Sequence, residues 1–112
     1  MSAAQIKQAD DGILEVSGML AFNCVTDVLR LSQKFFSSQE QLVFDLGGVE
    51  KIDSAGLALL VEWMVMAEKS GQSIAFQKTP KQLLDIARVS GLDEILPIVW
   101  LNSYKYKIRY RK

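Results

Sequence analysis

Two short strand patterns separated by a turn open the chain. The residues from Ala4 to Ala9 and from Ile13 to Ser17 predict two strands, the first of them weak and suited to a sheet edge. Asp10-Asp11-Gly12 between them favours a tight turn, because Gly accepts positive φ and Asp side chains bond to nearby backbone. We therefore expect the chain to begin with a β-hairpin.

A helical pattern follows the hairpin. Apolar residues spaced three, four and seven positions apart fall on one stripe, namely Val25, Val28, Leu29 and Phe36. Asn23 is the predicted N-cap, because its side-chain oxygen can accept a hydrogen bond from an unpaired backbone N–H. The helix is expected to end near Ser37-Ser38.

The centre of the chain predicts a buried strand, a long helix and another strand. Gln41 to Leu46 is almost continuously apolar and ends at Gly47-Gly48, which is typical of a central parallel strand. A helix is expected from about Ser54 to Ser70, with Gly71 as its stop signal. Ser73 to Gln77 is the next predicted strand.

The last helix has the clearest local signal. Thr79-Pro80-Lys81-Gln82 places Thr at the N-cap, Pro at the first helical position and Gln at the third, which is a capping-box pattern. The helix should run to about Ser90, where Gly91 ends it. Helices that alternate with strands imply right-handed crossovers. We predict a small α/β domain with a mixed, mostly parallel sheet and helices packed on it.

Composition narrows the classes of protein to consider. The 112 residues suffice for one small domain. There are no histidines and one cysteine, which excludes a Ser-His-Asp or Cys-His centre, a His-ligated metal, a CxxC pair and an internal disulfide. We predict no enzymatic activity, no metal and no cofactor.

The same features bear on the compartment. The longest nearly apolar stretch, Ala55 to Ala67, has thirteen residues, whereas a membrane-spanning helix needs about 20. Residues 1–7 have no basic leader followed by an apolar run, so we expect no secretory signal. With a lone cysteine, this predicts a cytoplasmic protein.

The net charge of zero hides a basic tail. Residues 104–112 have five bases and no acid, which leaves eight bases and thirteen acids elsewhere. Nucleic-acid binding by this mildly acidic body is not expected. We divide the chain into a domain over residues 1–100 and a basic, aromatic tail over residues 101–112. The tail suits an edge strand, contact with a membrane surface or RNA, or a solvated extension.

The most informative segment joins the central strand to the long helix. Asp53-Ser54 lies at the helix start, where free N–H groups and a partial positive charge would tolerate a phosphate on Ser54. Gly56 in the first turn indicates close approach of another backbone. The alternative is that Asp53 or Ser54 only caps the helix. Nearby, Asp45 is interpreted as a cap of the Gly47-Gly48 turn in preference to a partner contact.

The long helix has two apolar stripes. The first consists of Leu57, Leu60, Val61 and Met64. The second, roughly opposite, consists of Leu59, Trp63 and Met66. A sheet covered on one side needs only the first stripe, so the second is a candidate partner surface. The alternative, weighed equally, is that another helix covers it.

These motifs resemble the STAS domain family. The most specific part is Asp53-Ser54-Ala55-Gly56-Leu57 placed after Phe44-Asp45-Leu46. The Ser17-Gly18-Met19-Leu20 turn and the Ser90-Gly91-Leu92 ending also fit, so the resemblance extends from about Ile13 to Pro97. STAS domains occur in anti-sigma factor antagonists, in sulfate transporter tails and in a bacterial lipid-transport subunit. The resemblance implies a binding module.

Two subgroups of the family imply different partners. In the MlaB-type subunit of the Mla phospholipid transporter, the STAS protein binds the ATPase of an ABC complex, and residues 56–63 are most similar to that subgroup. This implies a subunit at the inner face of the inner membrane that contacts the ATPase through the helix start, Asp53, Ser54, Ala55 and Gly56. The second apolar stripe, Leu59, Trp63 and Met66, adds to this predicted partner surface on the helical spacing alone. In anti-sigma factor antagonists, a partner serine kinase phosphorylates the Ser of the Asp-Ser position. Ser54 matches that phosphoacceptor and fits both subgroups.

Overall fold

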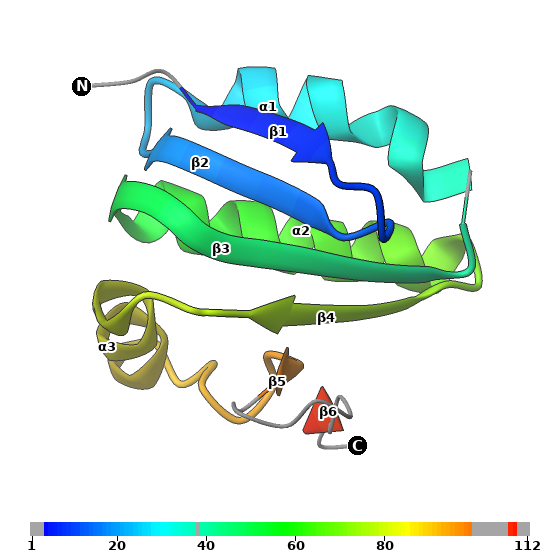
Figure 1. Cartoon of the computed structure of the whole chain (residues 1–112). Coiled ribbons are helices and arrows are strands. Elements are labelled where there is room, and N and C mark those ends of the chain that lie inside the picture. The colour runs from blue at the N-terminus through cyan, green and yellow to red at the C-terminus, as the bar shows by residue number, and fades with distance from the viewer. Residues whose placement is uncertain (1–3, 38, 100–107, 110–112) are drawn as a thin grey trace.

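The structure of the protein is a computed structural model that describes residues 4–37, 39–99 and 108–109. Figure 1 shows its elements in chain order. They are β1 (Gln5–Gln8), β2 (Leu14–Leu20), α1 (Val25–Ser32), the 3-10 helix η1 (Gln33–Ser37), β3 (Gln41–Ile52), α2 (Ser54–Lys69), β4 (Ser73–Gln77), α3 (Lys81–Val89), β5 (Ile98–Val99) and β6 (Ile108–Arg109). Up to α3, these elements follow the predicted order, with η1 added after α1.

The strands form one mixed sheet whose spatial order equals the chain order, from β1 to β6. β2, β3, β4 and β5 are parallel to one another, whereas β1 and β6 are antiparallel to their neighbours at the two edges. This confirms the predicted small α/β domain. The pairing of β6 with β5 makes Ile108–Arg109 an edge strand, and the rest of the predicted tail lies outside the described residues.

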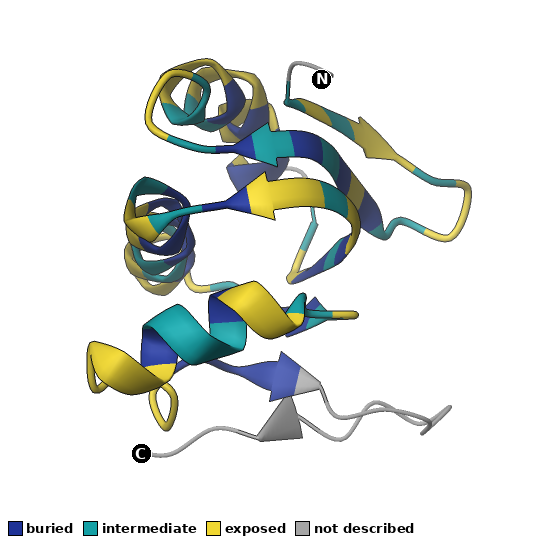
Figure 2. Cartoon of the chain, turned by 90° about the vertical axis from the view of Figure 1, so that its left-hand side faces the viewer, coloured by how far each residue is buried: buried dark blue, intermediate teal, exposed yellow. Residues whose placement is uncertain are grey.

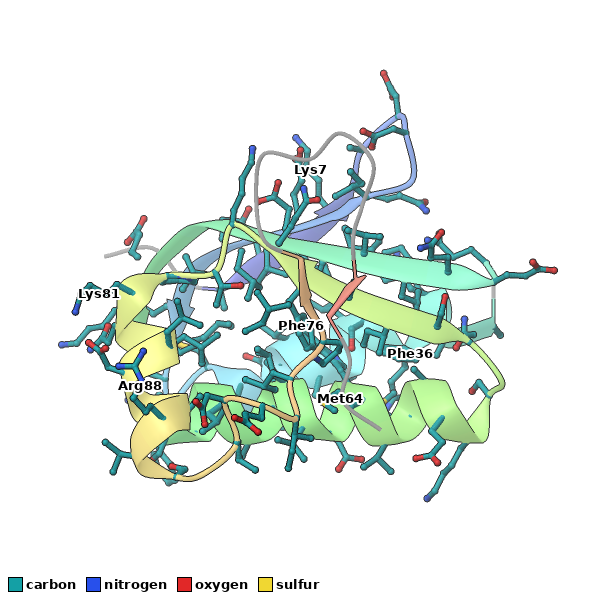
Figure 3. The ribbon with its side chains drawn as sticks, turned by 90° about the horizontal axis from the view of Figure 1, so that it is seen from below. Lys7, Phe36, Met64, Phe76, Lys81 and Arg88 are labelled. Carbon is teal, nitrogen blue, oxygen red and sulfur yellow. The ribbon has the colours of Figure 1, made fainter. Side chains whose placement is uncertain are left out.

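The helices α1 and α2 cover the same face of the sheet. α1 and α2 lie side by side on it, and α3 follows the carboxyl end of β4 and contacts α2 (Figures 1 and 2). In Figure 3, Phe76 of β4 points toward the helices and Lys7 of β1 points away from them. Within the described residues, the opposite face of the sheet therefore has no helical cover.

The core lies between this sheet and its helices and is centred on an aromatic stack. The ring of Phe44 in β3 stacks on the fully buried indole of Trp63 in α2, with centroids 4.1 Å apart. The indole Nε1–H donates to Ser32 Oγ of α1 at 2.8 Å. Because a buried N–H needs a partner, this bond allows a tryptophan to occupy the centre of the core.

Several predicted boundaries are confirmed. Gly12 has φ +89°, and the backbone N–H of Ile13 donates to Asp11 Oδ1 at 3.1 Å, so the first hairpin turns where expected. α2 ends at Lys69, two residues before Gly71. β4 has the bounds predicted from its apolar run.

The predicted end of β3 at Gly47-Gly48 is wrong, because the strand continues to Ile52. Asp45 pairs with Glu15 and Gly48 with Ser17, so β3 has one residue more than β2 over this interval. This extra residue makes a β-bulge, which bends a strand without ending it. A Cβ on Gly48 would lie 3.0 Å from Ser17 Cβ, so a larger residue there would require β2 to shift slightly.

Two predicted N-caps are also wrong. α1 begins after Cys24, and no side chain, including that of Asn23, caps it. Thr79 does not cap α3, and its buried hydroxyl oxygen has no partner among the described residues. Gln82 does not close a capping box. Its side-chain oxygen accepts a hydrogen bond from the backbone N–H of Ile52 at 3.4 Å, which ties α3 to the end of β3.

Candidate functional site

Asp53 joins three parts of the chain at the end of β3. Its Oδ1 accepts hydrogen bonds from the backbone N–H groups of Ala55 at 2.9 Å and Gly56 at 3.3 Å, so Asp53 is the N-cap of α2. Its Oδ2 accepts from the backbone N–H of Phe22 at 3.2 Å, in the loop between β2 and α1. The capping alternative is therefore confirmed for Asp53, and the carboxylate also fixes the Phe22 loop beside the start of α2.

Ser54 is the first residue of α2 and is exposed. Its hydroxyl makes no hydrogen bond within the described part of the chain. It lies at the positive end of a helix whose first N–H groups are partly occupied by Asp53. A hydroxyl in this position is free to bond to a partner or to accept a phosphoryl group.

Gly56 is buried where α2 crosses the ends of β2 and β3. A Cβ at this position would collide with the backbone carbonyl oxygen of Leu20 and with Cγ1 of Ile52. The close backbone approach inferred from the sequence is therefore present. It holds the first turn of α2 against the sheet and limits the freedom of Ser54, two residues earlier.

The structure corrects the prediction that the second stripe of α2 contacts a partner. Trp63 is 0% exposed and Leu59 is 4% exposed, so neither side chain is available at the surface. Met66 is half-buried and packs against the same core. The reason is that Trp63 faces the sheet, where its ring stacks on Phe44 of β3, while α1 lies beside α2 and supplies Ser32 as the partner of the indole N–H. The alternative, that another helix covers this stripe, is correct only in part: α1 lies on the side of Leu59, whereas the sheet covers Trp63.

An open groove between α1 and α2 was missed by the sequence analysis. It has a volume of about 450 Å³ and is lined by Phe22, Val25, Thr26, Leu29, Ala55, Ala58, Leu59 and Glu62. The most prominent of these residues is Phe22, whose side chain is 78% exposed. The small Ala55 and Ala58, one turn apart, are the signal in the sequence that could have indicated a hollow here. We refer to this feature as the α1–α2 groove.

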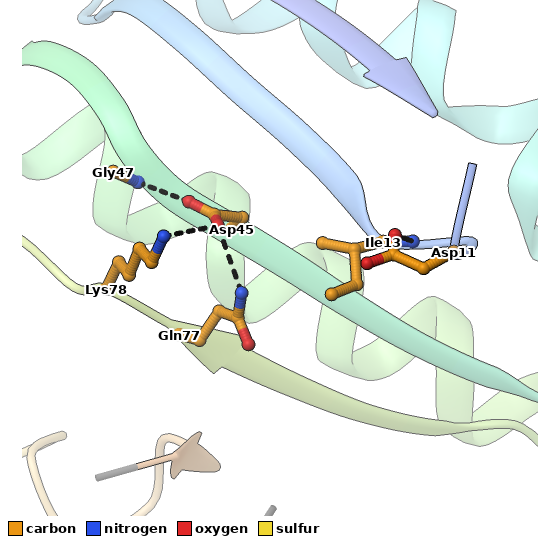
Figure 4. A network of polar contacts seen from close by, with 6 residues as sticks. All are labelled: Asp11, Ile13, Asp45, Gly47, Gln77 and Lys78. Atoms are coloured by element: carbon orange, nitrogen blue, oxygen red, sulfur yellow. Dashed lines mark hydrogen bonds and ion pairs between the residues drawn. The ribbon is translucent and has the colours of Figure 1, made fainter. Parts of the chain in front are cut away.

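A second polar cluster surrounds Asp45 on the helix-free face of the sheet (Figure 4). Asp45 Oδ1 accepts from the backbone N–H of Gly47 at 2.8 Å, so the predicted local bond is present, although Gly47 and Gly48 lie in the bulge of β3 and form no turn. Its Oδ2 accepts from Gln77 Nε2 at 3.0 Å and lies 3.6 Å from Lys78 Nζ. Both carboxylate oxygens are therefore occupied by residues of the same sheet.

None of the helices in the described residues is long and apolar enough to cross a bilayer. The described cysteine, Cys24, is half-buried at the start of α1 and forms no disulfide there.

The chain matches a known family and known folds. A family model described as "Mlab, STAS domain" matches residues 3–99. The structure is similar to that of the anti-sigma factor antagonist SpoIIAA in its unphosphorylated form. That comparison has a TM-score of 0.65 and 16% identity, covering 88% of this chain and 89% of that one.

Two longer chains contain a similar domain. The match to the structure of Mglu has a TM-score of 0.56 and 20% identity, over 70% of this chain and 20% of that chain. The match to SLC26A9 has a TM-score of 0.56 and 16% identity, over 71% of this chain and 16% of that one. At these identities the structural matches show the fold alone. Because the family model spans most of the sequence, the chain belongs to the MlaB-type STAS domain family.

Proposed function

We propose that this protein is a non-catalytic subunit that binds and supports the ATPase of an MlaB-like phospholipid ABC transporter. The match of residues 3–99 to the MlaB-type family model is the observation that carries this proposal. The proposed contact is the start of α2, from Asp53 to Gly56. Such a subunit would act in the cytoplasm, at the inner face of the inner membrane.

The geometry of this helix start suits recognition by another protein. Asp53 and Gly56 hold the first turn of α2 to the Phe22 loop and to β2, so the exposed Ser54 is presented from a rigid support. Little conformational freedom is lost when a preorganised surface binds. If the ATPase binds this surface better in its competent dimer than in its separated form, the subunit shifts the ATPase toward the dimer.

A binding assay with the purified ATPase of the same organism tests the proposal. Ser54→Arg places a long charged side chain at the proposed contact, and we expect it to abolish binding and ATPase stimulation. Ser70→Arg, at the other exposed end of the same helix, is the matched control and should bind normally. Unchanged binding of Ser54→Arg, or no binding of the wild-type protein, would overturn the proposal.

The exposed hydroxyl of Ser54 also supports a second candidate function. Its free position at a helix start suits an anti-sigma factor antagonist that a partner serine kinase switches by phosphorylation. SpoIIAA, which has a similar fold, is described as an anti-sigma factor antagonist in its unphosphorylated form. Incubation with the cognate kinase and ATP, followed by mass spectrometry, separates the two candidates. Phosphate on Ser54 that releases the partner, and is absent from Ser54→Ala, would favour the switch.

A further inference from the structure

The α1–α2 groove has the character of a docking site for one apolar side chain. Its floor is formed by Ala55, Ala58 and Leu59 of α2, and its α1 wall by Val25 and Leu29. Most of its lining is therefore apolar, although the groove is open to solvent.

Phe22 is the residue of this groove whose side chain contributes least to the fold. Its side chain is 78% exposed, and its ring makes no aromatic or cation contact within the described part of the chain. Its backbone, in contrast, is held in place by Asp53 Oδ2. A fixed backbone with an exposed aromatic ring presents a large contact area at low entropic cost, which is typical of residues that dominate interfaces.

The charges of the groove restrict what can occupy it. Glu62 is the one charged residue in its lining, and it makes no ion pair with the described residues. The nearby Asp27 of α1 is already paired with Arg30 at 3.3 Å. The groove therefore combines an apolar floor with one unneutralised carboxylate, which complements an apolar side chain accompanied by a cation.

The groove is continuous with the contact proposed above. Ser54 precedes Ala58 by one turn of α2, and the Asp53 carboxylate connects the helix start to Phe22. A partner that contacts Ser54 therefore meets the groove at the same time. The combined surface is larger than the exposed hydroxyl alone, and the groove supplies the apolar area that the helix start lacks.

From these observations we infer that the α1–α2 groove binds a segment of the ATPase subunit through an apolar anchor residue that packs on Phe22, with a Lys or Arg of the same segment facing Glu62. This inference rests on the proposed function and adds the chemistry of the partner surface. Phe22 then provides most of the contact area, Glu62 provides the charge preference, and Ser54 lies at the edge of the buried surface.

The test measures the dissociation constant of the complex with the purified ATPase, by calorimetry or interferometry. Phe22→Ala removes the exposed ring, and we expect binding to weaken at least tenfold, roughly the effect of losing a central interface residue. Val89→Ala is the matched control, because Val89 of α3 is 88% exposed and lies outside the groove. Its affinity should equal that of the wild-type protein.

A charge reversal tests the predicted cation. Glu62→Lys should weaken binding about tenfold at low salt and much less at high salt, because the lost attraction is screened. Glu68→Lys, also exposed on α2 but outside the groove, is the control and should bind normally. Equal effects of the two reversals would contradict a specific cation opposite Glu62.

The outcomes separate this inference from the proposed function. If Ser54→Arg abolishes binding and Phe22→Ala does not change it, the groove is not the docking site, although the proposed function remains. If the wild-type protein does not bind the ATPase, both are overturned. If Phe22→Ala instead dissociates a homodimer in light-scattering measurements, the occupant is a second copy of this chain and the inference is wrong.

Discussion

Two polar clusters are each built on an aspartate, Asp45 within β3 and Asp53 directly after it, but the surroundings of the two carboxylates differ. Each aspartate accepts a hydrogen bond from the backbone N–H two residues later, at Gly47 and at Ala55. The second oxygen of Asp45 accepts from the side-chain amide of Gln77 in β4 and lies beside the ammonium of Lys78, which directly follows β4. Both oxygens of this carboxylate therefore have partners. The second oxygen of Asp53 accepts from the backbone N–H of Phe22. Nearby, the Ser54 hydroxyl and the Phe22 ring have no bonding partner within the described residues.

This difference separates a structural cluster from a surface suited to recognition. In the Asp45 cluster, both carboxylate oxygens have partners in the same chain, so a molecule that binds this carboxylate would have to displace an existing bond. Around Asp53, the existing bonds fix the backbone, while Ser54 and Phe22 are left to interact with something else. Asp45→Ala should therefore lower stability without changing binding, whereas Ser54→Ala should weaken binding with little change in stability.

The largest effect on stability is expected at Gly56, which brings the start of α2 against the sheet. Alanine in a helix is normally more stable than glycine by roughly 0.5–1 kcal/mol. At Gly56 the added Cβ would collide with the Leu20 carbonyl oxygen and Ile52, so Gly56→Ala should destabilise the protein by about 2–3 kcal/mol. Chemical denaturation measures this free energy. A stabilised Gly56→Ala protein would contradict the close packing.

The next largest effect is expected at Asp53. Asp53→Ala removes the cap of α2 and the bond to the Phe22 loop, and we expect a loss of about 2 kcal/mol from the two contributions together. Asp53→Asn separates them, because asparagine still caps a helix but its amide nitrogen cannot accept from the Phe22 N–H. Hydrogen exchange at the Phe22 amide should accelerate in both variants. Protection of that amide in Asp53→Asn would mean that the loop is held by other contacts.

A smaller effect is expected for the corresponding change in the structural cluster. Asp45→Ala leaves the Gly47 N–H and the Gln77 amide without their partner, but Lys78 is largely exposed and its ion pair contributes little. We expect a loss of about 1 kcal/mol in the free energy of unfolding. The affinity for the ATPase should not change. Weaker binding by a folded Asp45→Ala protein would contradict the division between the two clusters.

The sequence predicted the position of Asp53-Ser54 because local patterns define it: an apolar strand before, a helical stripe after, and a cap residue between. The bulge at Gly47-Gly48 was not predictable in the same way, because it depends on pairing with Ser17 of β2. The exposure of Phe22 is also non-local, since an aspartate 31 residues later holds its backbone.

The burial of Trp63 shows the same limit. Its stripe on α2 is apolar whether it contacts a partner or the chain's own core, and only the packing of α2 on the sheet and beside α1 decides between these. Ser32 supplies the polar partner for the indole from α1. A helical pattern gives the direction of a side chain relative to its own helix. It does not indicate which neighbouring element lies in that direction.

The smallest effect on stability, and the sharpest test of the comparison, is expected at Ser54. Ser54→Ala removes an exposed hydroxyl without a partner in the described residues, so the free energy of unfolding should change by less than about 0.5 kcal/mol. Binding to the ATPase should nevertheless weaken severalfold, because a hydrogen bond across the interface contributes about 0.5–1.5 kcal/mol. Ser70→Ala at the far end of α2 is the control for both measurements. Loss of stability without loss of binding in Ser54→Ala would show that the hydroxyl serves the fold and that the contact with the partner lies elsewhere.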